Sequence, residues 1–159
     1  MKHDKTVTVA FTGHRYIDAS LCRNIRDRLT ATILDAYEHG FRNFISGFAI
    51  GFDMMAAEIV VSLRETHEDM TLTAAIPFRG QSSRFNYYDR QRYDRLIREA
   101  DEVFLLSESY YPRCFLERDA FMVDNSSMLI AYYDGRERGG TFYTVKKADR
   151  NGVPVVNVY

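Results

Sequence analysis

The sequence predicts an α/β protein in three layers: a Rossmann-like open parallel sheet of five to six strands with helices on both faces. Apolar runs of strand length alternate with segments of helical period along the whole chain. Runs such as 103–106 contain no alternating polar residues, so both faces of these strands are expected to be buried, as in a parallel sheet between helices. The length of 159 residues predicts one domain covering 1–159.

The expected strands and helices alternate in order. Strands are expected at 7–11, 44–45, 72–76, 103–106, 128–132 and 155–158. An apolar residue at every fourth position from Leu21 to Tyr37 predicts a first helix, which Gly40 ends. The nearly uninterrupted apolar run 52–63 predicts a second helix that is covered on most sides. Further helices are expected around 93–100, from Pro112 onward and over 141–150.

Composition and charge exclude several classes of protein. The 21 Lys and Arg against 22 Asp and Glu leave a formal charge of −1, unlike a dedicated duplex-DNA binder, so a nucleic-acid partner is not expected. Cys22, Cys114 and four scattered histidines lack metal-ligand spacing, so no metal site is expected. The absence of a signal core or bilayer-length apolar run predicts a cytoplasmic protein with no membrane partner. Tyr110 and Tyr111 are candidates for a contact in a homo-oligomer.

Three glycine-bearing loops follow predicted strands and form the candidate site. In a parallel sheet such loops emerge at the carboxyl edge, so we expect them to meet around a small anion. Each loop alone could be an ordinary turn, and neither a Walker loop nor GxGxxG is present. The candidate ligand-binding residues of the three loops are Thr12, Gly13, His14 and Arg15, then Ser46, Gly47, Gly51 and Asp53, then Asp134, Gly139, Gly140 and Thr141.

The segment 78–88 has no helical period and predicts a functional lid, with Phe78, Gln81 and Arg84 as candidate ligand contacts. The stretch 79–98 contains six Arg against two Asp, so it could hold the phosphates of a single strand or be a solvated helix face.

Two acidic residues of the second predicted helix are candidates for catalysis. Asp53 and Glu58 are separated by about 140° around a helix axis, so they do not both point straight into one site. Glu58 lies in apolar surroundings, which indicates either a catalytic acid or a structural salt bridge.

Several segments together resemble the YpsA-like family of the SLOG superfamily. They are Thr12 to Arg15, Ser46 to Asp53 with Ala56-Ala57-Glu58, Ala75 to Phe78 with Gly80-Gln81, Met122-Val123-Asp124, and Tyr133-Asp134-Gly135 with Gly139-Gly140-Thr141. The resemblance implies a Rossmann-like domain that binds nucleotides or ADP-ribose-like molecules, with Gly139, Gly140 and Thr141 at a phosphate and Glu58 in the pocket wall. We therefore expect a cytosolic sensor or regulator, and no further cofactor.

The same superfamily contains the DNA-processing protein DprA and the LOG phosphoribohydrolases, which implies two alternatives. One is a nucleotide N-glycosidase that uses Glu58 or Asp53. The LOG pattern PGGxGTxxE ends in a catalytic Glu, whereas Thr144 stands at that position here and no proline precedes the glycines. This departure favours binding over turnover and leaves enzymatic activity open. The weaker alternative is DprA-like binding of single-stranded DNA.

Overall fold

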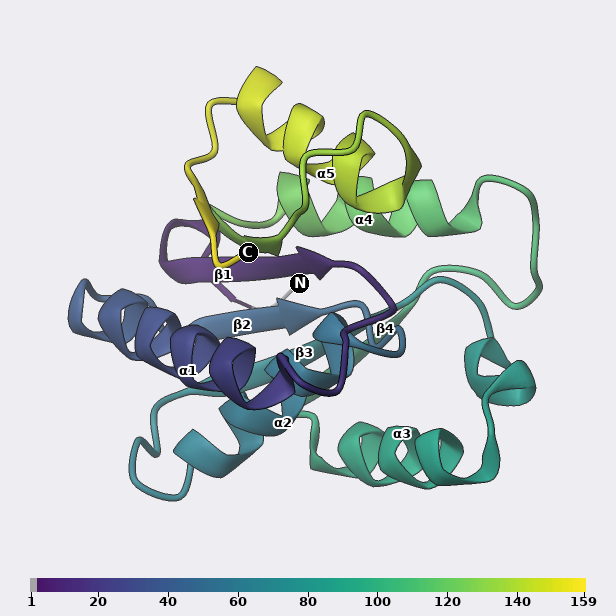
Figure 1. Cartoon of the computed structure of the whole chain (residues 1–159), viewed down its shortest axis with the longest axis horizontal. Helices are drawn as coiled ribbons and strands as arrows, with labels where there is room; N and C mark the ends of the chain where they lie inside the picture. Colours follow the sequence, from purple (N-terminus) through teal and green to yellow (C-terminus); the bar gives the residue numbers. More distant parts are fainter. Residues whose placement is uncertain (1–2) are drawn as a thin grey trace.

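The computed structural model describes residues 3–159, which form a parallel sheet of six strands with helices on both faces (Figure 1). The strands lie in the order β4-β3-β2-β1-β5-β6, and all neighbouring pairs are parallel. They are β1 (Thr8–Gly13), β2 (Asn43–Ser46), β3 (Thr71–Ile76), β4 (Glu102–Leu105), β5 (Met128–Tyr132) and β6 (Val155–Asn157). The predicted Rossmann-like fold class is confirmed.

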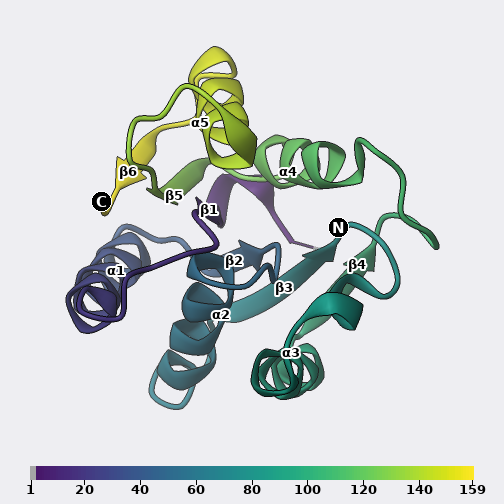
Figure 2. The ribbon, with the colours of Figure 1, turned by 45° about the vertical axis from the view of Figure 1, so that its right-hand side comes forward.

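The helices are divided between the two faces of the sheet. Figure 2 shows α1, α2 and α3 on one face and α4 and α5 on the other. The α-helices are α1 (Cys22–Glu38), α2 (Phe52–Leu63), α3 (Tyr87–Glu99), α4 (Cys114–Asp124) and α5 (Gly139–Arg150). Two short 3-10 helices are η1 (Lys5–Val7) and η2 (Gln81–Arg84). No helix among residues 3–159 is both long enough and apolar enough to cross a membrane.

Two apolar cores, one on each side of the sheet, explain the unbroken apolar runs. On β1, Val9 and Phe11 belong to the core beneath α1–α3, while Ala10 belongs to the core beneath α4 and α5. Successive side chains of a strand point to opposite faces, so a strand between two helix layers is apolar at every position. Helix α2 is buried over most of its length, as its apolar sequence predicts.

One premise of the fold prediction is wrong for the strand at 103–106. Strand β4 pairs only with β3 and is an edge of the sheet, and Val103 is 47% exposed. The helices cover an edge strand incompletely, so its apolar sequence does not mean that both faces are buried. The other edge strand, β6, follows Pro154 and lacks a second neighbour.

The chain order reverses at β1, and this reversal positions the site. From β1 the chain builds β2, β3 and β4 on one side, and it then crosses to β5 on the other side of β1. The loops after β1 and β5 therefore leave the carboxyl edge of the sheet in opposite directions and open a crevice there.

Candidate functional site

Two adjoining cavities lie where the loops after β1, β2, β3 and β5 meet. The larger, of about 630 Å³, is called the aromatic cavity, and the smaller, of about 410 Å³, the polar cavity. Arg15, Ala49 and Phe115 line both, so the two are continuous. The aromatic cavity is also lined by Ile50, Phe78, Gln81, Ser83, Arg84, Phe85 and Tyr110. The polar cavity is also lined by Thr12, Gly13, His14, Asp53, Pro112, Leu116, Arg118, Asp119, Gly140 and Thr141.

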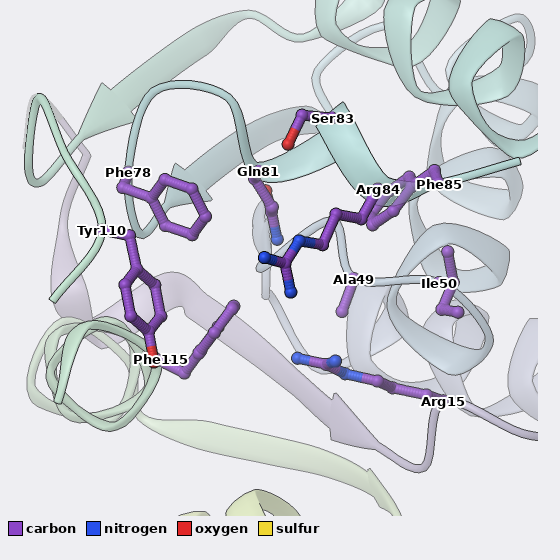
Figure 3. Close-up of a pocket in the computed structure, with 10 residues that line it drawn as sticks. All are labelled: Arg15, Ala49, Ile50, Phe78, Gln81, Ser83, Arg84, Phe85, Tyr110 and Phe115. Atoms are coloured by element: carbon purple, nitrogen blue, oxygen red, sulfur yellow. The ribbon is translucent and has the colours of Figure 1, made fainter. Parts of the chain in front are cut away.

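The aromatic cavity combines rings on one side with guanidinium groups on the other (Figure 3). The Phe78 ring lies edge-on to Tyr110 and Phe115, with centroids 5.6 and 5.9 Å away. Arg15 and Arg84 reach in from the opposite side, and the Arg15 guanidinium lies 5.0 Å from the Phe115 centroid. Among residues 3–159, no carboxylate forms a salt bridge with either arginine. The cavity therefore offers flat apolar surfaces together with two positive charges.

Gln81 holds the segment after β3 against the loop after β2. Its side-chain Nε2 donates a hydrogen bond to the Gly47 carbonyl oxygen (3.0 Å), and its Oε1 accepts one from the Tyr93 hydroxyl (3.1 Å). The segment predicted as a lid thus forms part of the wall of the aromatic cavity through Phe78, Gln81 and Arg84, and it is tied to the structure beneath it.

A buried arginine of α4 organises the polar cavity. Arg118 is 4% exposed, and its Nη1 donates to the carbonyl oxygens of Gly47 (2.5 Å) and Ala75 (3.3 Å). Its Nε donates to the Asp119 carboxylate (2.8 Å). A side chain at position 47 would place Cβ 2.6 Å from this guanidinium, so a larger residue there would have to displace Arg118. The arginine thereby links β2, β3 and α4 beneath the cavity.

Asp53 is a buried carboxyl group at the wall of the polar cavity. It lies in the first turn of α2, is 7% exposed, and its Oδ1 has no hydrogen-bond partner among the described residues. Burial raises the pKa of Asp53 to about 7, with Asp119 also raising it, while the positive charge of Arg118 opposes this rise. The Asp53 carboxyl is therefore partly protonated near neutral pH, which is the condition for proton exchange with a ligand.

The loop before α2 brings Asp53 to the cavity through a conformation that requires glycine. Gly51 has φ +82°, and a Cβ there would lie 2.2 Å from the Arg15 carbonyl oxygen. Ser46 supports the turn, because its hydroxyl donates to the Asp53 carbonyl oxygen (2.8 Å) and accepts from the Phe48 N–H (3.2 Å). The loops after β1 and β2 therefore pack directly on each other.

The amino end of α5 closes the polar cavity from the other side of β1. Gly140 and Thr141 line the cavity, and the helix has no side-chain cap at its amino end. Uncapped N–H groups and the positive end of the helix dipole together favour an anion. The Asp134 N–H donates to His14 Nε2 (3.0 Å). This hydrogen bond joins the loop after β5 to the loop after β1.

The structure brings most of the predicted ligand-binding residues to the two cavities. Ser46, Gly47, Gly51, Asp134 and Gly139 do not line them and instead shape or support the loops that do. The residues that line them are Thr12, Gly13, His14, Arg15, Asp53, Phe78, Gln81, Arg84, Gly140 and Thr141.

Glu58 is placed differently from the position in the pocket wall that the family resemblance implied. It lines neither cavity, and its carboxylate pairs with Arg92, with Arg95 (3.4 Å) and with Arg26 (3.9 Å). It therefore forms the structural salt bridge, one of the two possibilities that its sequence left open. The reason is geometric, because five residues along a helix turn a side chain away from the face that presents Asp53.

Sequence reasoning missed the contribution of α4, which supplies Phe115, Arg118 and Asp119 to the site. A signal was present: Arg118 lies four residues after Cys114 and four before Met122, both of which are buried. An arginine in the middle of a buried helical stripe requires several acceptors, because a buried guanidinium without partners is costly.

The arginine-rich stretch 79–98 is largely neutralised by the chain itself. Arg79 pairs with Glu108, and Arg92 with Glu58 and Asp89. Arg90 donates to the Ser83 carbonyl oxygen (2.7 Å). The positive surface that the sequence indicates is therefore smaller in the folded protein.

Of the two tyrosines predicted at a subunit contact, Tyr110 is 60% exposed and lines the aromatic cavity. Tyr111 is partly buried and its hydroxyl donates to Glu117. An oligomeric contact through these residues stays a prediction.

Comparisons with known proteins agree with this fold. Residues 10–153 match the YpsA family, described as the YspA SLOG family. A UPF0398 protein from Bacillus cereus strain B4264 is 26% identical over 153 residues, which cover 91% of this chain and 83% of the relative. A UPF0398 protein from Staphylococcus haemolyticus is 25% identical over 141 residues, or 83% of this chain and 75% of the relative.

A solved structure with a similar fold is that of DNA processing protein A from Streptococcus pneumoniae, with a TM-score of 0.66 and 17% identity. The match covers 95% of this chain but 50% of that protein, so this chain spans half its length. At this identity the likeness concerns the fold alone. The family match, in contrast, extends over most of the sequence, and the chain therefore belongs to the YspA SLOG family.

Proposed function

We propose that this protein binds a nucleotide or a nucleotide-derived anion, such as an ADP-ribose-like molecule, across the two cavities. The observation that carries the proposal is the continuity of an aromatic, arginine-lined cavity with a polar one that ends at the amino end of α5. A base stacks on aromatic rings, and a phosphate suits unpaired guanidinium groups and free helix N–H groups. The volumes of about 630 and 410 Å³ lie in the range of small-molecule sites.

The proposed role is capture of the ligand, as in a sensor or regulator. Thr144 occupies the position of the LOG catalytic Glu, and its hydroxyl donates to the Gly140 carbonyl oxygen (2.7 Å) within its own helix. It lines neither cavity. The residue at the LOG catalytic position therefore supplies no acid or base to a bound nucleotide, which supports binding over LOG-like turnover.

Calorimetric titration with ribonucleoside mono-, di- and triphosphates and with ADP-ribose tests the proposal. Phe78→Ala removes a ring and Arg84→Gln a charge from the aromatic cavity, and each is expected to weaken binding about 10- to 100-fold. Arg98→Gln, an exposed arginine on α3 that lines neither cavity, is the matched control and should leave affinity unchanged. Absence of binding across the panel would contradict the proposal. So would an affinity that neither Phe78→Ala nor Arg84→Gln weakens.

A second candidate function, hydrolysis of a nucleotide N-glycosidic bond, is favoured by Asp53. Its carboxyl, with a pKa raised by burial to about 7, suits a general base at neutral pH. In this reaction Asp53 takes a proton from water as the oxygen attacks ribose C1′, and the C–N bond electrons leave with the base. Chromatographic detection of released base tests it, with Asp53→Asn expected to abolish release and Glu58→Gln to preserve it. No release from any nucleotide of the panel would exclude this function.

Binding of single-stranded DNA is the weaker alternative function. The DprA of Helicobacter pylori, whose structure is described for its single-stranded DNA binding mode, has a similar fold, with a TM-score of 0.63 at 16% identity over 94% of this chain and 63% of that one. Titration of a fluorescent oligodeoxynucleotide at several salt concentrations tests this function, since affinity through phosphate contacts falls as salt rises. Binding that is insensitive to salt would argue against it.

A further inference from the structure

Asp53 is the one residue of the two cavities with an unsatisfied buried polar atom. Among residues 3–159, three buried side-chain oxygens lack a hydrogen-bond partner: Asp53 Oδ1, Thr73 Oγ1 and Glu102 Oε2. Of these residues, Asp53 alone lines one of the two cavities. Buried polar atoms in folded proteins are nearly always paired, so a carboxyl group that lines a cavity and has one oxygen without a partner is suited to a donor from outside the chain.

Two of the neighbouring donors are already used within the protein. Arg118 donates to two carbonyl oxygens and to Asp119. The Ser46 hydroxyl donates to the main-chain oxygen of Asp53. Asp53 lies in the first turn of α2, and the backbone of Ala49 lowers the pKa of its carboxyl against the stronger effect of burial. Arg15 lies close enough for its charge to lower the pKa of Asp53, but no donor of the described residues bonds Oδ1, so a bound molecule or water can supply one.

Asp53 lies near the junction of the cavities. Asp53 lines the polar cavity, and Ala49, whose backbone lies close enough to lower the pKa of the Asp53 carboxyl, lines both cavities. In a nucleotide whose base lies on the rings of the aromatic cavity and whose phosphate lies at the amino end of α5, the ribose is the group between the two. The ribose of a ribonucleotide presents two hydroxyl donors there, and the ribose of a 2′-deoxyribonucleotide presents one.

We infer that Asp53 accepts a hydrogen bond from a ribose hydroxyl and makes the site selective for ribonucleotides over deoxyribonucleotides. The inference rests on the proposed function. A site built to pair with a hydroxyl discriminates against the analogue that lacks it, because a buried oxygen is then left unpaired.

The test compares AMP with 2′-deoxyAMP and 3′-deoxyAMP by calorimetry at pH 8, with GMP, CMP and UMP and their deoxy counterparts as further series. For the wild-type protein, removal of one hydroxyl is expected to weaken binding about 10- to 100-fold. Asp53→Leu, which keeps the approximate size of the side chain but has no acceptor, should bind the ribonucleotide about as weakly as the deoxy analogue, while its affinity for that analogue stays unchanged. Binding of the deoxy analogue also demonstrates that the variant is folded.

Glu58→Gln is the matched control, because it removes a carboxylate charge from the same helix away from the cavities. It should keep the full discrimination. Equal affinity of the wild-type protein for ribo- and deoxyribonucleotides, as expected if water satisfies Oδ1, would overturn the inference, as would discrimination that survives Asp53→Leu. Both outcomes leave the proposed function standing. Absence of binding by every nucleotide would overturn both.

Discussion

The raised pKa of Asp53 makes a quantitative prediction about stability. Burial is its main cause, raising the pKa from an ordinary 3.8 to about 7. The folded state therefore retains a proton that the unfolded chain loses, and the contribution of Asp53 to stability is full below about pH 3.8 and is lost as the pH rises to about 7. At 1.36 kcal/mol per pKa unit, the complete loss is about 4 kcal/mol.

Asp53→Asn removes this titration while keeping the size of the side chain. We compare the free energy of unfolding of the variant with that of the wild type. The difference, variant minus wild type, should rise by about 3 kcal/mol as the pH increases from 4.5 to 8. The other titrating groups are shared by the two proteins, so their effects cancel in the difference.

Urea denaturation followed by circular dichroism at pH 4.5, 6 and 8 measures this difference. Asp149→Asn, which removes an exposed carboxyl from α5, is the control and should follow the wild-type profile. A difference between Asp53→Asn and wild type that stays constant over the whole range, or that falls with rising pH, would refute the assignment of a raised pKa.

Three other substitutions test how the site is built, each by urea denaturation. Arg118→Met leaves buried carbonyl and carboxyl groups without their cation and should reduce the free energy of unfolding by about 3–5 kcal/mol; a loss below about 1 kcal/mol would contradict its organising role. Gly51→Ala should cost more than Gly80→Ala, because both positions have positive φ but only Gly51 would place a Cβ 2.2 Å from a backbone oxygen; equal costs would contradict this. Glu58→Gln weakens the partly buried pair with Arg92 and should lower the free energy of unfolding by about 1 kcal/mol or less. It should leave the affinity for nucleotides unchanged, and an altered affinity would show that Glu58 contributes to the ligand site.

Some of the site could be predicted because its signals are local. The loops that contain Thr12, Asp53 and Thr141 each follow a recognisable apolar strand. In a parallel sheet all such loops leave by the carboxyl edge, so their convergence follows from the fold class alone. This is why most of the glycine-loop residues expected at the ligand do line the two cavities.

Other features depend on contacts between distant parts of the chain. Arg118 bonds the carbonyl oxygen of Gly47, 71 positions away, and Glu58 pairs with Arg92, 34 positions away. No helical or strand period encodes such pairings. The exposure of Val103 similarly depends on which strand happens to lie at the sheet edge.

By itself, then, the sequence determined the order of strands and helices, the parallel sheet and the edge at which its glycine loops meet, because periodicity and strand direction are properties of neighbouring residues. The tertiary structure alone decided that α4 completes the site, that Glu58 is held in salt bridges and that one oxygen of Asp53 stays unpaired beside the cavity. These depend on the desolvation and charge that each side chain meets, and both arise only when segments far apart in the chain pack together.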